Sequence, residues 1–117
     1  MTSNHLKKER EINAVVDAMI PATEGEERFW DTAAREVLRG VLAHCNEHNR
    51  CSHAELWQAL NSPVAEIRDM CRATALGRVG YTFIKDADSQ QAAAVHAHLI
   101  SYMSCLKVAA RSKIERE

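Results

Sequence analysis

The sequence predicts an all-α fold, a compact bundle of about five or six helices of which two are long. Apolar residues recur at three- and four-residue spacing along most of the chain, as on the buried face of a helix. Only 4 of the 117 residues are glycine and 2 are proline, which favours helix over sheet. Helix-capping patterns recur between the apolar stretches. With 46% hydrophobic residues, residues 1–117 are expected to form a single domain around one core.

The two N-terminal helices are predicted from their apolar stripes. The first is expected over residues 6–20 and ends before Pro21, because the residue before a proline avoids the α conformation. The second is expected over residues 27–48, where a wide apolar face continues for about five turns. Its apolar positions are Trp30, Ala33, Ala34, Val37, Leu38, Val41, Leu42 and Cys45.

The third and fourth helices are predicted from their start signals. Ser52 and Glu55 have the spacing of a capping box, which indicates a short helix to about residue 60. Ser62 followed by Pro63 is a cap residue before a proline at the first helical position. This pair predicts a fourth helix to about residue 73.

The C-terminal part is predicted to hold one short and one long helix. Two glycines interrupt residues 76–84, so we expect a short irregular helix there, with a strand at 79–84 as the alternative. Asp88 and Gln91 again have capping spacing. They predict a last long helix over residues 89–114.

The totals limit the classes of function. Fifteen Lys+Arg against sixteen Asp+Glu give a net charge of −1, whereas a free-standing nucleic-acid binder usually has a basic excess. Any DNA contact must then come from a local patch or be weak and salt-sensitive. No apolar run reaches the length of a membrane span and the first residues are polar, so neither a membrane contact nor a secretory signal is expected. The cysteines, Cys45, Cys51, Cys71 and Cys105, are expected to be reduced thiols, mostly in the core.

Basic residues at helical spacing are the candidates for binding DNA or a partner protein. They are Arg68, Arg72, Arg78, Lys85, Lys107 and Arg111. Cations one helical turn apart can contact successive phosphates. The alternative is a solvated surface balanced by nearby carboxylates. Arg35 lies within an apolar face, so we expect a carboxylate or carbonyl group to hold it.

Histidines and tryptophans give two weaker candidate sites. His44 and His48 are one turn apart and could bind zinc with Cys51 or His53. No two cysteines have zinc-knuckle spacing, however, and the favoured interpretation is a histidine-rich helix end. His96 and His98 should point to different sides of their helix, one in a polar gap and one exposed. Trp30 and Trp57 could stack on single-stranded DNA, although their apolar stripes favour core packing.

No residues suggest catalysis by this chain. The sequence contains neither G-x-x-x-x-G-K-[ST] nor G-x-G-x-x-G, and no pair of carboxylates suggests a general acid and base. We therefore expect no enzymatic activity and no cofactor.

Several short segments, in their order along the chain, resemble the all-α domain of the TraD-type coupling proteins of bacterial conjugation. They are Met19-Ile20-Pro21, the acidic loop Glu24-Gly25-Glu26-Glu27, Phe29-Trp30, Ala34-Arg35, Glu55-Leu56-Trp57 and Asp88-Ser89-Gln90-Gln91-Ala92-Ala93. The resemblance extends over roughly residues 12–110. The histidine- and cysteine-rich segment 44–53 has no counterpart in this pattern.

The resemblance implies a function that the residues alone do not. Coupling proteins are hexameric ATPases of type IV secretion systems at the bacterial inner membrane, and their all-α domain is an insertion in a RecA-like ATPase domain. It lies at the cytoplasmic mouth of the hexamer and takes part in recognising DNA and the relaxase–DNA substrate. We accordingly expect an excised recognition domain with DNA and relaxase or accessory transfer proteins as partners. The alternative is a free-standing helical adaptor that binds proteins and is modulated by zinc.

Overall fold

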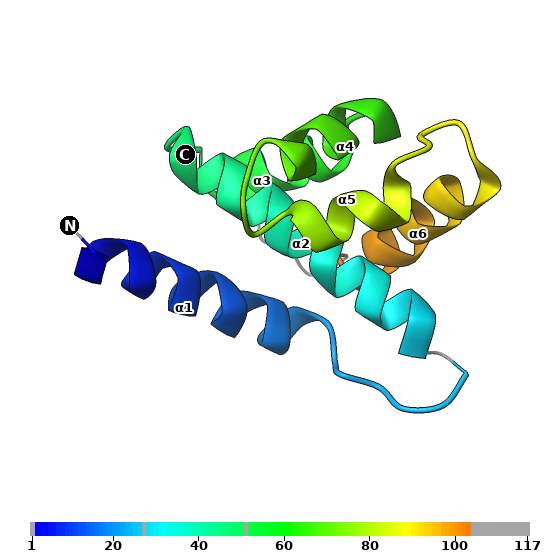
Figure 1. The fold of residues 1–117 in the computed structure, drawn as a ribbon, viewed down its shortest axis with the longest axis horizontal. Coiled ribbons are helices and arrows are strands. Elements are labelled where there is room, and N and C mark those ends of the chain that lie inside the picture. The colour runs from blue at the N-terminus through cyan, green and yellow to red at the C-terminus, as the bar shows by residue number, and fades with distance from the viewer. Residues whose placement is uncertain (1, 27, 51, 104–117) are drawn as a thin grey trace.

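The computed structural model describes residues 2–26, 28–50 and 52–103, with the side chains from residue 8 onward, and all its regular elements are helices. In order, they are α1 (Thr2–Met19), α2 (Arg28–Glu47), α3 (His53–Leu60), α4 (Val64–Arg72), α5 (Arg78–Ile84) and α6 (Gln90–Tyr102) (Figure 1). The predicted all-α class is thus confirmed. The alternative strand at 79–84 is wrong, because α5 occupies these residues. The part of the last predicted helix beyond residue 103 lies outside the described residues.

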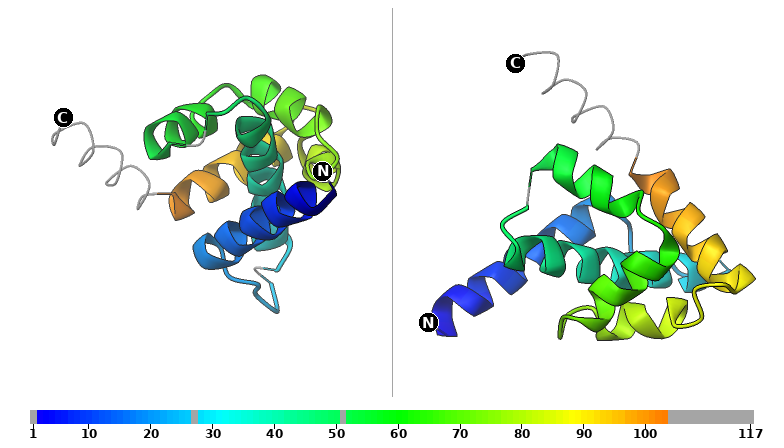
Figure 2. Two further views of the ribbon diagram at one scale, coloured as in Figure 1. Left: turned by 90° about the vertical axis from the view of Figure 1, so that its left-hand side faces the viewer. Right: turned by 90° about the horizontal axis from the view of Figure 1, so that it is seen from above.

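Helix α2 is the centre of the fold and packs against each of the other helices. Figure 2 shows α3 and α5 on opposite sides of it. Most of the apolar positions predicted for α2 are fully buried, among them Ala34, Leu38 and Val41, and they meet Ile67 and Leu99 from other helices in one core. Among the described residues, no helix is long and apolar enough to cross a membrane.

Helix α5 is regular, not irregular, because its glycines allow close packing and do not loosen the chain. A Cβ atom added to Gly80 would lie 2.6 Å from the Glu36 carbonyl oxygen of α2. Likewise, a Cβ on Gly40 would lie 2.6 Å from the Cys71 sulfur of α4. Glycine at these positions lets α4 and α5 approach the backbone of α2.

The N-termini of three helices test the predicted caps, and one is confirmed. Ser52 and Glu55 form the predicted capping box at α3. At α4 the prediction is shifted by one residue: Pro63 is the N-cap without a side-chain hydrogen bond, and the Ser62 hydroxyl donates back to the Gln58 carbonyl oxygen at 3.5 Å.

At α6 the prediction of an Asp88 cap is wrong, because the N-cap is Ser89. Its hydroxyl oxygen accepts a hydrogen bond from the Ala92 amide at 3.0 Å. The Gln91 side chain does not return to the cap but donates to the Phe83 carbonyl oxygen at 3.1 Å, which ties α6 to the end of α5.

The C-terminus of α2 closes with a Schellman motif. Asn49 has a positive φ of 55°, a left-handed conformation that asparagine tolerates better than most residues. The Arg50 amide donates to the Cys45 carbonyl oxygen at 2.8 Å, and the Asn49 amide donates to the Asn46 carbonyl oxygen at 3.3 Å. These bonds satisfy the last carbonyl groups of α2 before the chain turns toward α3.

Two arginines of α2 hold α1 against it. The Arg35 guanidinium donates to the Ile20 carbonyl oxygen at 2.5 Å and forms an ion pair with Asp17. Arg39 donates to the Asn13 amide oxygen at 2.8 Å. The prediction that a carboxylate or carbonyl group holds Arg35 is confirmed. Its guanidinium joins α2 to α1 and the residue that follows it.

Candidate functional site

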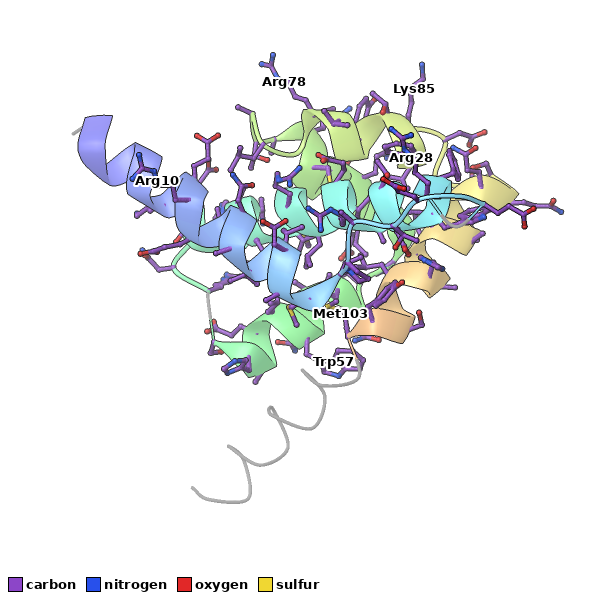
Figure 3. All side chains as sticks on the ribbon, turned by 90° about the horizontal axis from the view of Figure 1, so that it is seen from below. Arg10, Arg28, Trp57, Arg78, Lys85 and Met103 are labelled. Atoms are coloured by element: carbon purple, nitrogen blue, oxygen red, sulfur yellow. The ribbon has the colours of Figure 1, made fainter. Side chains whose placement is uncertain are left out.

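The outer face of α5 carries two exposed cations. Arg78 is the first residue of α5 and Lys85 is its C-cap. Lys85 lies seven positions after Arg78, close to two helical turns, so the two lie on one face with the exposed Thr82 between them. Figure 3 shows both side chains projecting to the same side of α5. Neither forms an ion pair with any residue in the described part of the chain.

The predicted cations of α4 differ from those of α5 because they share one carboxylate. The Arg68 Nε atom lies 3.3 Å from an Asp69 side-chain oxygen, and an Arg72 terminal nitrogen lies 3.4 Å from the same oxygen. Asp69 therefore compensates part of their charge. Of the six predicted cations, Arg68 and Arg72 thus have a carboxylate partner, whereas Arg78 and Lys85 have no ion pair within the described residues. Lys107 and Arg111 lie outside the described residues.

An aromatic group adjoins the α5 face where α2 begins. The rings of Phe29 and Phe83 meet edge to face with centroids 5.6 Å apart, and Phe29 makes a similar contact with Trp30 at 4.9 Å. Phe29 is 43% exposed. Arg28, labelled in Figure 3, precedes it at the start of α2 and has no ion pair within the described residues.

The two tryptophans lie at the edge of the core. Trp30 and Trp57 are partly buried and pack against buried apolar residues. The prediction that both tryptophans pack against the core is therefore confirmed, but part of each side chain stays exposed. Among the described aromatic residues, Phe29 has the exposed ring. Sequence reasoning did not select it as a candidate for stacking on DNA, because the neighbouring Trp30 was the more conspicuous residue.

A buried carboxylate joins three segments, and sequence reasoning missed it. Asp31 is only 2% exposed. One of its oxygens accepts hydrogen bonds from His98 Nε2 and from the Tyr102 hydroxyl, both at 2.7 Å, and the other accepts one from the Thr23 hydroxyl. The available signal was an aspartate on the same face of α2 as Ala34 and Leu38, with His98 and Tyr102 one turn apart on α6.

The ionisation of Asp31 follows from these bonds. Burial alone would raise the pKa of Asp31, because it disfavours the charged form. The hydrogen bonds from His98, Thr23 and Tyr102 outweigh burial, and the net pKa is lowered. Asp31 is therefore a structural carboxylate that stays ionised near neutral pH.

The histidines of α6 point to different sides, as predicted. Nε2 of His96 lies 2.7 Å from the Leu60 carbonyl oxygen of α3, whereas that of His98 contacts Asp31. The prediction that one of them is exposed is wrong, because both are partly buried.

The possible zinc ligands form a pair of stacked rings. The centroids of His44 and His48 are 4.2 Å apart, and His48 Nδ1 donates to the His44 carbonyl oxygen at 2.8 Å. Burial and the neighbouring His48 lower the pKa of His44. His53 is exposed at the start of α3, Cys51 lies outside the described residues, and the residues that are described contain no group of three potential metal ligands. A zinc site stays a prediction.

The two cysteines that the structure describes are core residues, as predicted. Cys45 and Cys71 are buried free thiols. Burial raises the pKa of Cys71 to about 12, so its thiol stays protonated and unreactive near neutral pH.

Comparison with known proteins identifies the family. The family model for the type IV secretion-system coupling protein DNA-binding domain matches residues 2–115. Neither the search of curated proteins nor the search of solved structures gave a match. The family match extends over nearly the whole chain and confirms the resemblance to conjugative coupling proteins. The chain therefore belongs to the family of DNA-binding domains of type IV secretion-system coupling proteins.

Proposed function

We propose that this domain is a non-catalytic recognition module that contacts the DNA substrate through the outer face of α5. In the coupling protein it would face the cytoplasm, as part of a homohexameric ATPase, and meet DNA alone or bound to a relaxase or an accessory transfer protein. The family supports DNA as the ligand. The absence of a nucleotide-binding motif from the sequence supports a role without catalysis.

The observation that carries this proposal is the pair of cations on one face of α5, neither of which forms an ion pair within the described part of the chain. Arg78 and Lys85 are about 10 Å apart along the helix, and each strand of duplex DNA carries one phosphate for about every 3.4 Å of the duplex axis. The two side chains can therefore contact different phosphates of one DNA molecule. Arg68 and Arg72 fit this role less well, because DNA would compete with Asp69 for them.

The overall charge sets the expected strength of binding. With a net charge of −1, the isolated domain lacks the positive field that draws basic proteins to DNA. Binding should therefore be weak and fall steeply with salt, and several copies in a hexamer would supply the avidity that one domain lacks.

Fluorescence anisotropy with labelled duplex DNA, at about 50 mM and 200 mM salt, tests the proposal. We expect the Arg78→Ala/Lys85→Ala variant to bind more weakly at low salt. Its slope of log affinity against log salt should be shallower by about 1.8, or roughly 0.9 for each lost phosphate contact.

The matched control is Arg68→Ala/Arg72→Ala, which removes the same charge from α4. It should keep most of the affinity and of the salt slope. A larger loss in the control than in the α5 variant would move the contact to α4. No binding by the wild-type domain at low salt would remove DNA as its direct ligand and leave relaxase and accessory proteins as the partners to test.

A further inference from the structure

We propose that Phe29 and Phe83 form a stacking platform for a base of single-stranded DNA, with phosphates of the same strand held by Arg28 and Lys85. This inference rests on the proposed function, and it adds a strand preference and a second set of contacts to it. The phosphate-contacting face of α5 does not discriminate between single and double strands. An exposed aromatic ring does, because duplex bases are already stacked on one another.

The geometry of the rings supports a base-binding role. Phe29 makes edge-to-face contacts with Phe83 and with Trp30, at interplanar angles of 73° and 85°. Such contacts orient a ring without covering it, and 43% of Phe29 remains exposed. A stacking platform requires a ring that is both rigid and accessible.

A hollow beside Phe29 has room for the base. It is an open depression of about 400 Å³, lined by Gly25, Glu26, Arg28, Phe29, Thr32 and Phe83. Gly25 adds no crowding there, since even a Cβ atom on it would meet nothing within 4 Å. Glu26 disfavours a phosphate inside the hollow, whereas a neutral base avoids this repulsion. The charge pattern thus favours a base in the hollow and phosphates outside it.

The cations that flank the hollow complement a DNA strand. Arg28 precedes Phe29, and Lys85 lies two residues after Phe83. Neither forms an ion pair with a described residue. Figure 3 labels Arg28 at the start of α2 and Lys85 at the end of α5, and the rings of Phe29 and Phe83 join these two helices. A polyanion whose bases are free to unstack is the ligand that matches apolar rings between two such cations.

The first test compares a labelled oligothymidine of about 12 nucleotides with a hairpin duplex by fluorescence anisotropy at about 50 mM salt. Phe29→Leu keeps apolar volume but removes the aromatic face. It should lower affinity for the single strand about 5- to 150-fold, the range for loss of one stacked base, and leave duplex affinity unchanged. Phe29→Tyr should restore single-strand binding, and Val79→Ala, at another exposed apolar residue of α5, should have no effect.

The second measurement does not depend on affinity. Trp30 lies in edge contact with Phe29, so in a Trp57→Phe background its fluorescence reports on the platform. Saturating oligothymidine should quench this fluorescence, and the hairpin duplex should not.

The outcomes separate this inference from the proposed function. If a folded Phe29→Leu variant keeps its single-strand affinity while Arg78→Ala/Lys85→Ala loses duplex binding, the platform is wrong and the α5 face stands. If Phe29→Leu lowered the affinities for single-stranded and duplex DNA equally, the platform would also be wrong, because the ring would then support the packing of the domain and would not stack on a base. If the wild-type domain binds neither form, both proposals fail and Phe29 is better explained as a contact to protein.

Discussion

Asp31 is the residue at which α2, α6 and the loop before α2 converge. A buried carboxylate is costly unless hydrogen bonds replace its water, and Asp31 receives bonds from Thr23, His98 and Tyr102. These partners also orient the neighbouring residues Phe29 and Trp30, since they fix the first turn of α2. The polar cluster therefore holds the first turn of α2, which carries Phe29 and Trp30.

We expect Asp31→Asn to lower the free energy of unfolding by about 1–3 kcal/mol. The amide keeps one accepting oxygen for His98 and Tyr102 but presents a donor group where the carboxylate accepted from Thr23, and it loses the charge that strengthens these bonds. Urea denaturation near pH 7 measures the change. Asp88→Asn, at an exposed aspartate, should change stability by less than about 0.5 kcal/mol.

The stability difference between wild type and Asp31→Asn should also depend on pH. Folding lowers the pKa of Asp31 below its ordinary value of 3.8, so the unfolded chain takes up the proton first. The carboxylate's contribution to stability is thus fully present above pH 3.8 and is lost as the pH falls through the lowered pKa. A difference that stays constant on acidification below pH 3.8 would show that the carboxylate charge contributes nothing.

Helix α6 provides a prediction at the scale of one element. Ser89→Ala removes the oxygen that accepts from the Ala92 amide and should cost about 1 kcal/mol. Asp88→Ala, one residue earlier, should cost much less because Asp88 does not cap the helix. Thermal or urea unfolding of the two variants distinguishes the caps, and the opposite order of stability would restore Asp88 as the cap.

The helices were predictable from sequence, but the choice between adjacent cap residues was not. Apolar periodicity located the two N-terminal helices, because burial of one face imposes the same spacing on any buried helix, and start signals located α3, α4 and α6. At the N-termini of α4 and α6, two neighbouring residues are both suited to precede a helix, and the backbone decides between them. The Ser62 hydroxyl donates to the Gln58 carbonyl oxygen of α3 and does not cap α4. At α6, Ser89 and not Asp88 is the N-cap. Sequence spacing does not specify such local geometry.

The candidate site was predictable only in part. Arg78 and Lys85 were selected from sequence, but their common face became evident only when residues 78–84 proved to be a regular helix. Phe29 and Phe83 are distant in sequence, so their contact depends on the packing of α5 against α2. That packing relies on Gly80, which sequence reasoning interpreted as a loosening residue.

At the scale of the whole molecule, α2 links all other helices, and both α1 and α3 pack chiefly on it. Helix α3 is also tied to α6, because Nε2 of His96 lies 2.7 Å from the Leu60 carbonyl oxygen. Helices α4, α5 and α6 contact one another as well as α2, whereas α1 packs chiefly on α2. Proteins open locally where few contacts hold an element. The domain should therefore behave as a core of α2 to α6 with α1 as a separately opening part, so that the α5 face stays intact when α1 detaches.

Hydrogen exchange of the Arg35→Met variant tests this division. Methionine keeps the apolar stem but removes the bonds to Ile20 and Asp17. Loss of about 1.5 kcal/mol of charge-assisted bonding should speed amide exchange in residues 8–20 roughly tenfold. Exchange in α2, α4 and α5 should not change, because their contacts do not pass through Arg35. Arg10→Met, on an exposed part of α1, is the matched control. Faster exchange throughout the domain would mean that α1 and the core unfold together, and the arginine would then support the proposed DNA-contacting face of α5 as well as α1.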